Sequence, residues 1–356
     1  MLDIPEKLYK ALQSEHPKDQ RNSMKMYPSS ASMKLPNGTI VGACARAQYY
    51  RWFECIRDGE PDPEGALIFA TGDALHDMVV RMIRSTAMAS NLEVLTVEQA
   101  VYEHDLLLSG RSDFVVMDRN DGSIHGCEVK TVGEGAIYIM SNGGRVPLPK
   151  IEHLMQATIY LDKYRKNAIE TGTRVMKGFI LLYVARSESW KLKSYPHGSH
   201  FKHIWQYYMT MDDTGKVTVT DQRGDKVDVG DLNINYINDR YTFILDKIKK
   251  KELPDREFAY QYSEDVLKAM SDAGKLNKAQ TALVDKWVDN GAKAGSLTVE
   301  KGDFQCIYCN NKNTCYSATP DVFETESHAL LPYETVEEVK EEKTGKGMSD
   351  VINNMI

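Results

Sequence analysis

Two acidic residues and a lysine occur at a spacing that could bring them together on one face of a β-sheet. Glu128 and Lys130 are two residues apart in the run SIHGCEVKT, so their side chains project to the same side of a strand in any register. Asp113 lies in the preceding run, GRSDFVVMD, and Asn120-Asp121-Gly122 between the two runs predicts a hairpin turn. A turn centred on Asp121-Gly122 would place Asp113 opposite Lys130.

These residue types suit the hydrolysis of a phosphodiester bond. The reaction needs a hard divalent cation that polarises a phosphoryl oxygen and acidifies a water molecule, and carboxylate oxygens bind such a cation well. Asp113 and Glu128 could supply the oxygens, and the Lys130 ammonium could orient or deprotonate the water or offset charge in the transition state. Acids and lysines also alternate on many solvent-exposed strands, which leaves a structural interpretation open.

Further polar residues flank the carboxylates in the sequence. His76 lies in a segment with apolar residues at helical spacing, so we expect it on a helix that precedes the two strands. Gln156 and Tyr160 form an i,i+4 pair on a helix expected over about 150–170. A neutral imidazole suits divalent manganese, although one helical histidine, or one such pair, can equally be structural.

Taken in order, these residues resemble the nuclease motifs of the RecB-like branch of the PD-(D/E)XK superfamily. The matching positions are Gly72-x-x-x-His76, Gly110-x-x-Asp113, Glu128-x-Lys130 and Gln156-x-x-x-Tyr160. The implied ligands of magnesium or manganese are His76, Asp113, Glu128 and the main-chain carbonyl of Val129. The resemblance also implies that Lys130 serves the water, while Gln156 and Tyr160 organise the site and the DNA backbone. Ser112 stands where the superfamily's name has a proline.

Three of the six cysteines lie close together, as Cys306-x2-Cys309-x5-Cys315. Thiolates at such spacing converge on one soft metal ion or cluster. A tetrahedral set needs a fourth ligand, for which the remaining cysteines are Cys44, Cys55 and Cys127. Cys127 alternates with Glu128, so we expect it to point into the core of the sheet.

The segment Cys44-x-Arg46-x-x-Tyr49-Tyr50 resembles the N-terminal cysteine motif of the iron–sulfur subset of these nucleases. This subset includes the CRISPR-associated RecB-like exonucleases and the AddB nuclease domain, in which one early cysteine joins three late ones. The implied ligands of a 4Fe–4S cluster are Cys44, Cys306, Cys309 and Cys315. Such a cluster would close a loop of about 260 residues and tie the two ends of the chain together. A zinc site made by the same cysteines, or by three of them with His328, stays open.

The pattern along the chain and the resemblance together predict an α/β fold. We expect a PD-(D/E)XK core of α/β/α type, with a helical iron–sulfur region formed from both chain ends. The expected ranges are 1–60 for an N-terminal helical region, 61–200 for the nuclease core, 201–318 for strands, helices and the late cysteines, and 319–356 for an acidic, disordered tail. Two details are more specific. The first helix should run to Gly59, and the helix that carries His76 should bury Leu75, Met78, Val79, Met82 and Ile83.

Charge and hydropathy limit the partners. The net charge is −7, and residues 321–356 hold nine acids against three lysines, a balance of −6 that leaves −1 for the first 320 residues. A nearly neutral body is compatible with a local basic groove for nucleic acid. We expect a cytoplasmic protein without a membrane segment, because no apolar run reaches the roughly 18 residues that a membrane helix needs.

The sequence therefore predicts a magnesium- or manganese-dependent deoxyribonuclease, an exonuclease on single strands or duplex ends in recombination, repair or replication. Basic and aromatic residues interleave between Arg174 and His203, a pattern that could follow a single strand, although a solvated sheet edge is an alternative. A C-terminal segment, MSDVINNMI, could dock on a protein partner, although a frayed terminus is an alternative. The alternatives are a scaffold that binds DNA ends without cutting them, and a nuclease for flaps or RNA.

Overall fold

The computed structural model describes residues 24–54, 63–86, 91–140, 147–186, 203–260, 262, 264–274, 276, 278–289 and 303–316. Its contacts divide the chain into two units. Unit 1 comprises residues 1–31 and 59–241, and unit 2 comprises residues 32–58 and 242–356. The expected acidic tail, Cys55, His328 and most of the basic and aromatic stretch before His203 lie outside the described residues.

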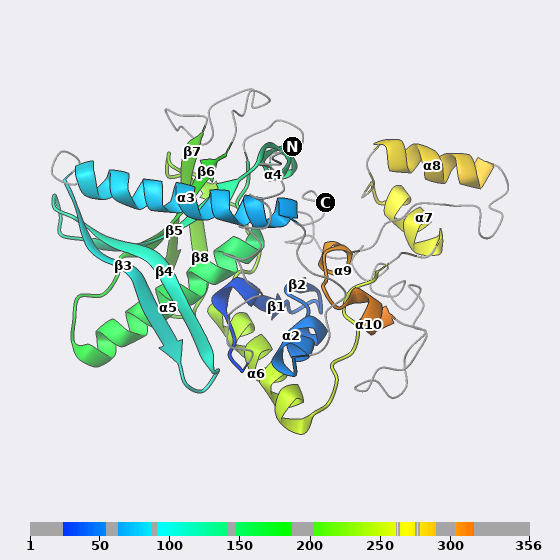
Figure 1. Cartoon of the computed structure of the whole chain (residues 1–356), viewed down its shortest axis with the longest axis horizontal. Coiled ribbons are helices and arrows are strands. Elements are labelled where there is room, and N and C mark those ends of the chain that lie inside the picture. Colours follow the sequence, from blue (N-terminus) through cyan, green and yellow to red (C-terminus); the bar gives the residue numbers. More distant parts are fainter. Residues whose placement is uncertain are drawn as a thin grey trace, which may run out of the picture. The chain divides into compact units, whose positions relative to one another are not determined.

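Unit 1 is built on one seven-stranded sheet, so the chain has the mixed α/β fold expected from its sequence (Figure 1). The strands, in both sheet order and chain order, are β3 (Leu92–Glu103), β4 (Leu108–Asp118), β5 (Ile124–Val132), β6 (Gly178–Ala185), β7 (Ile204–Met211), β8 (Val217–Thr220) and β9 (Lys226–Val227). Only β5 and β6 pair in parallel; the other neighbours are antiparallel. The sheet therefore continues beyond residue 200, the expected end of the nuclease core.

The predicted hairpin is present, but its register differs from the expected one. Phe114 pairs with Cys127 and Met117 with Ile124, so the strands are shifted by two residues from a turn centred on Asp121-Gly122. The turn is wider than expected and is closed by two hydrogen bonds: the Asp118 N–H donates to the Ser123 carbonyl, and the Gly122 N–H donates to the Asp118 carbonyl. Because the shift is even, Asp113 and Glu128 keep a common face, and continuation of the ladder puts Asp113 opposite Glu128 rather than Lys130.

Two long helices cover opposite faces of this sheet. Helix α3 (Pro63–Thr86) packs on the face that carries Cys127 and Val129. Helix α5 (Ile151–Thr171) lies on the face of Glu128 and Lys130, to which its side chains hydrogen bond. As expected, Cys127 is buried in the core and α5 ends at Gly172, whose left-handed φ of 66° is easy only for glycine. The short α4 (Glu134–Met140) lies between β5 and α5.

The buried face of α3 was predicted only in part. Val79 is buried and Ile83 partly so, but Met78 and Met82 are 37% and 54% exposed. Val80 is buried instead, because α3 contacts the sheet through a narrow stripe around Val79 and Val80. The remaining element of this unit that precedes the sheet is the 3-10 turn η1 (Pro28–Ser30).

Unit 2 joins two segments that are far apart in the sequence. Its early segment contains the hairpin β1 (Ser32–Lys34) and β2 (Ile40–Gly42), followed by α2 (Ala45–Trp52). Its late segment contains α7 (Glu264–Asp272), α8 (Lys278–Asp289), α9 (Phe304–Ile307) and α10 (Lys312–Tyr316), while α6 (Ile234–Lys250) crosses the boundary between the units. The prediction that the first helix reaches Gly59 was wrong. It ends at Trp52, and Glu54 has a left-handed φ of 52° that breaks the helical path.

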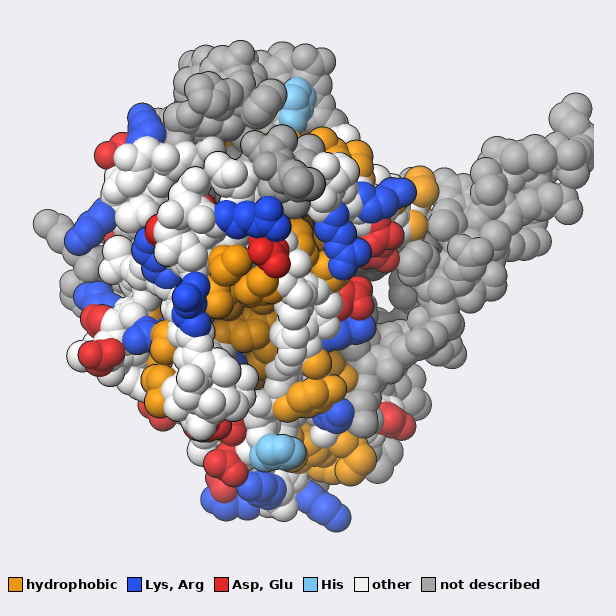
Figure 2. Space-filling model, turned by 90° about the vertical axis from the view of Figure 1, so that its left-hand side faces the viewer, with side chains coloured by type: hydrophobic (Ala, Val, Ile, Leu, Met, Phe, Trp, Pro, Cys, Tyr) orange, Lys and Arg blue, Asp and Glu red, His pale blue; other side chains and the backbone are white. Residues whose placement is uncertain are grey.

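The surface combines apolar and basic side chains. On the face drawn in Figure 2, hydrophobic side chains form a group with Lys and Arg side chains around it.

Within the described residues, no helix has the length and apolar character needed to cross a membrane.

Candidate metal and phosphodiester site

An open cleft of about 550 Å³ in unit 1 brings together the predicted metal ligands and the lysine. The predicted site residues in its lining are His76, Asp113, Glu128, Val129 and Lys130. They come from α3, β4 and β5. The two remaining predicted residues, Gln156 and Tyr160, are buried on α5 and hydrogen bond to this group or to its neighbours.

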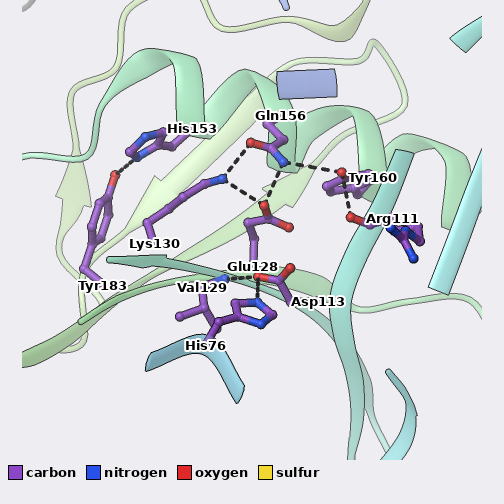
Figure 3. Close-up of polar contacts among 10 residues, drawn as sticks. All are labelled: His76, Arg111, Asp113, Glu128, Val129, Lys130, His153, Gln156, Tyr160 and Tyr183. Carbon is purple, nitrogen blue, oxygen red and sulfur yellow. Dashed lines mark hydrogen bonds and ion pairs between the residues drawn. The ribbon is translucent and has the colours of Figure 1, made fainter. Parts of the chain in front are cut away.

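Glu128, Lys130 and Gln156 form a closed triangle of hydrogen bonds (Figure 3). Lys130 Nζ donates to Glu128 Oε1 at 2.9 Å and to Gln156 Oε1 at 2.8 Å. Gln156 Nε2 in turn donates to Glu128 Oε1 at 2.7 Å. Each member fixes the other two, so the ammonium is held beside the carboxylate, and within the described residues one of its three N–H donors has no acceptor.

Glu128 is the most deeply buried charge of the site, with 3% of its surface exposed. Burial raises the pKa of its carboxyl group to about 7, against the opposing effect of Lys130, and the charge of Asp113 adds to the increase. Oxygen Oε2 is buried and accepts no hydrogen bond from any described residue. An unpaired buried carboxylate oxygen is unstable by itself and favours a proton or a cation next to it.

Asp113 lies between the backbone of β5 and the imidazole of His76. Its Oδ2 accepts a hydrogen bond from the Val129 N–H at 2.5 Å and lies 2.7 Å from His76 Nε2. The contact between His76 and Asp113 is close enough for an ion pair, but its geometry is not that of a hydrogen bond. The adjacent Asp113 carboxylate raises the pKa of His76, and burial opposes that increase. The contact with Val129 involves its amide; the carbonyl as a ligand stays a prediction.

Two tyrosines of α5 contact β4, the strand that carries Asp113, and so position it. Tyr160 donates from its hydroxyl to the main-chain carbonyl of Arg111 at 2.8 Å, and the Tyr164 hydroxyl lies 2.6 Å from Ser112 Oγ. Ser112 is fully buried. Its hydroxyl contact with Tyr164 therefore connects β4 to α5.

Gly72 and Gly110 lie where neighbouring elements approach each other closely. A Cβ at Gly110 would lie 3.1 Å from the Tyr160 hydroxyl and 2.8 Å from Pro28, and a Cβ at Gly72 would lie 3.2 Å from Thr131 Oγ1. The first glycine lets α5 reach β4, and the second lets α3 approach β5. Glycine at these two positions therefore serves close packing of the elements around the site.

The residues fit a hard divalent cation in type, although no ligand set is preassembled. Carboxylate oxygens with one imidazole suit magnesium or manganese, and the buried Glu128 Oε2 is a possible ligand atom that has no hydrogen-bond partner in the described part of the chain. Among the residues that the structure describes, no three His, Cys, Asp or Glu side chains are arranged as they would be around a metal ion. His76 and Asp113 instead face each other.

The four predicted cluster cysteines come together in unit 2. Cys44, at the N-terminus of α2, lines a small cavity together with Cys306, Cys309 and Cys315. The early and late segments are joined around it, because Glu257 accepts a hydrogen bond from Ala45 N–H at 2.9 Å and Gln305 donates to the Gly42 carbonyl at 3.3 Å. All four cysteines are free thiols.

The environment of these four cysteines would favour a positively charged ligand if the thiols ionised. Burial, with Glu257 and Cys315 nearby, raises the pKa of Cys44 to about 12, and burial next to Cys44 also raises the pKa of Cys306. Thiolates therefore need a compensating charge here. Arg46 donates to Cys315 Sγ at 3.6 Å and the Asn311 N–H donates to Cys309 Sγ at 3.4 Å, contacts that suit sulfur with anionic character.

The sequence did not single out several residues of the cleft. His153, one turn before Gln156 on α5, and Arg186, at the end of β6, both line it. The i,i+3 spacing of His153 and Gln156 was a usable signal, since such residues share one face of a helix. Arg186 was noted only as one of several basic residues, and its place depends on the pairing of β6 with β5.

Comparison with known proteins adds no identification: no protein-family profile matches the chain, and no curated protein has a significantly similar sequence.

The raised pKa of Glu128 predicts a specific dependence of stability on pH. In the metal-free protein the free energy of unfolding should fall as pH rises from 4.5 to about 7, because the carboxyl ionises in the unfolded chain before it can do so in the folded one. Glu128→Gln should remove this loss, and the exposed control Glu170→Gln should retain it. Urea unfolding across this range measures the effect. An identical pH dependence in wild type and Glu128→Gln would contradict the burial argument.

Proposed function

We propose that the chain is a magnesium- or manganese-dependent DNA nuclease, acting as an exonuclease on single strands or duplex ends. The observation that carries the proposal is the convergence of His76, Asp113, Glu128 and Lys130 in one cleft. Hydrolysis adds water across a P–O ester bond, and it requires groups that hold a cation, position the water and stabilise the anionic phosphoryl oxygens. The cleft has residues for each of these tasks.

The roles follow from the contacts of each side chain. His76, Asp113 and Glu128 would hold the cation, which when bound polarises the phosphodiester and lowers the pKa of a water molecule. Lys130 keeps one N–H free for the attacking water or a phosphate oxygen, since Glu128 and Gln156 engage the other two. Gln156 positions Lys130, and Tyr160 positions the strand that carries Asp113 through the Arg111 carbonyl.

The arrangement of elements supports a PD-(D/E)XK core within unit 1. The hairpin β4–β5 carries both carboxylates, β6 joins β5 in parallel after α5, and α3 and α5 cover opposite faces. This is the order of elements that the α/β/α core requires. The antiparallel strands from β7 onward extend the sheet beyond it.

The cysteines of unit 2 are proposed to hold a 4Fe–4S cluster. Four thiols, one buried and three partly exposed, line one cavity, and Arg46, Arg256 and Lys312 lie in the same lining. These cations suit the net negative charge of a cluster with four thiolates. The cluster would fasten the early segment to the late one, which is a structural task distinct from the hydrolysis.

Cleavage of end-labelled DNA with manganese tests the nuclease. Wild type should degrade the DNA, and Lys130→Ala should be slower by about 100-fold or more, because a group that serves proton transfer or charge stabilisation is lost. Lys177→Ala removes an exposed lysine that pairs with Asp121 and should retain full activity. Blocked 5′ and 3′ ends and an RNA strand of the same sequence would define polarity and substrate. DNA binding without any cleavage would favour a scaffold, and full activity in Lys130→Ala would exclude this site.

Metal analysis after anaerobic purification tests the cluster. We expect iron and acid-labile sulfide in wild type and in Cys127→Ala, and their loss in Cys44→Ser and Cys315→Ser, because only the latter pair lies in the cysteine cavity. The same two variants should be less resistant to urea, since the link between the segments of unit 2 is broken. A colourless wild-type protein that contains stoichiometric zinc would overturn the cluster.

A further inference from the structure

His153 lies in the cleft and has no role in the site as described so far. It is three residues before Gln156 on α5, so both side chains project from one face of the helix toward Lys130 (Figure 3). Its Nδ1 is 2.9 Å from the Tyr183 hydroxyl. The residue is partly exposed, and its Nε2 has no hydrogen-bond partner among the residues that the structure describes.

The hydrogen bonds of Tyr183 determine which ring nitrogen of His153 carries the proton. Tyr183 is fully buried, and its hydroxyl oxygen accepts a hydrogen bond from the Lys150 N–H at 3.1 Å. The hydroxyl proton then needs an acceptor, and His153 Nδ1 is its one other partner in the described part of the chain. Nδ1 therefore accepts, which leaves the N–H of the neutral ring on Nε2.

Tyr183 is rigidly held, so it can fix the imidazole in place. Its ring stacks on Trp205 with centroids 5.4 Å apart and an interplanar angle of 10°, and it meets Tyr207 edge-on at 5.9 Å. Trp205 and Tyr207 are themselves fully buried. In the β5–β6 ladder Tyr183 pairs with Lys130, so the anchor of His153 stands next to the strand residue that carries the amine.

The imidazole is an uncharged donor. Desolvation of the ring by the surrounding protein, reinforced by the positive charges of Lys130 and Lys150, lowers the pKa of His153 well below its ordinary value. Lys130 has a single N–H left for substrate, because Glu128 and Gln156 occupy the other two. A second donor beside it would serve a group with two or more acceptor oxygens, such as a phosphodiester.

We propose that His153 Nε2–H binds a non-bridging oxygen of the scissile phosphodiester, with Tyr183 as the residue that positions it. The inference rests on the proposed nuclease function and extends it by one substrate contact. A neutral donor fixed before the reaction can stabilise the charge that grows on that oxygen without adding a second cation beside Lys130.

Sulfur substitution at the cleaved phosphate tests this contact. Oligonucleotides with a single Rp or Sp phosphorothioate are cleaved by wild type, His153→Ala, His153→Phe, His153→Gln and Tyr183→Phe under single-turnover, saturating conditions. On the ordinary phosphate, His153→Ala and His153→Phe should be slower by about 100-fold, as for the loss of one oxyanion donor. Tyr183→Phe should lose less, and His153→Gln should recover part of the rate through its amide N–H.

The stereochemistry separates a phosphate contact from a structural role. Sulfur is a poor acceptor, so for one diastereomer wild type should already be slow and the loss of His153 should cost little more. For the other diastereomer the full cost should remain, and Tyr183→Phe should follow the same pattern. His125→Gln changes a histidine of β5 that contacts Ser123 outside the cleft and should behave as wild type.

Two outcomes would overturn the proposal independently of folding. Equal costs of His153→Phe on both diastereomers and on the phosphate would mean that the ring does not touch a non-bridging oxygen. Unchanged rates in both donor-free variants would mean that it has no part in cleavage. These results require an active wild type, whereas a wild type that cleaves none of the substrates would refute the nuclease function, and this inference with it.

Discussion

The burial of the Glu128 carboxylate is the constraint on which the site depends. A charge with 3% exposure is stable only when neighbouring groups compensate it, and Lys130 and Gln156 do so at one oxygen. The second oxygen has no hydrogen-bond partner among the described residues. A cation at that oxygen would compensate the rest of the carboxylate charge. The burial, the hydrogen bonds and the proposed chemistry thus depend on the same arrangement of Glu128, Lys130 and Gln156.

The rest of unit 1 keeps that arrangement in place. Helix α5 supplies Gln156 to the charged pair and Tyr160 to the neighbouring strand, so a single helix sets the position of both carboxylates. On the other face, α3 brings His76 to Asp113, and Gly72 permits the approach. In unit 2, desolvation raises the pKa of Cys44 and of Cys306, and a thiol of the other segment adds to each increase, so thiolates there would need a compensating charge.

Local sequence patterns predicted those features that depend on periodicity alone. The shared face of Glu128 and Lys130, the burial of Cys127 and the end of α5 at Gly172 all follow from residues close in sequence. The predicted strand register was wrong by two residues, because a turn signal marks where the chain reverses but not how wide the loop is. The place of Arg186 in the cleft depends on β6 lying beside β5, a pairing between segments that are separated by a whole helix, so the sequence could not predict it. His153 was missed although its spacing from Gln156 placed both on one face of α5.

Manganese-soaked crystals, with anomalous diffraction measured at the manganese edge, test the central claim most directly. Wild type should bind an ion within coordination distance of the Asp113 and Glu128 carboxylates, with His76 turned from Asp113 toward the metal. Glu128→Gln should lose this ion and retain the fold. An ion held elsewhere, or a wild-type cleft without manganese at saturating concentration, would contradict the metal-dependent site.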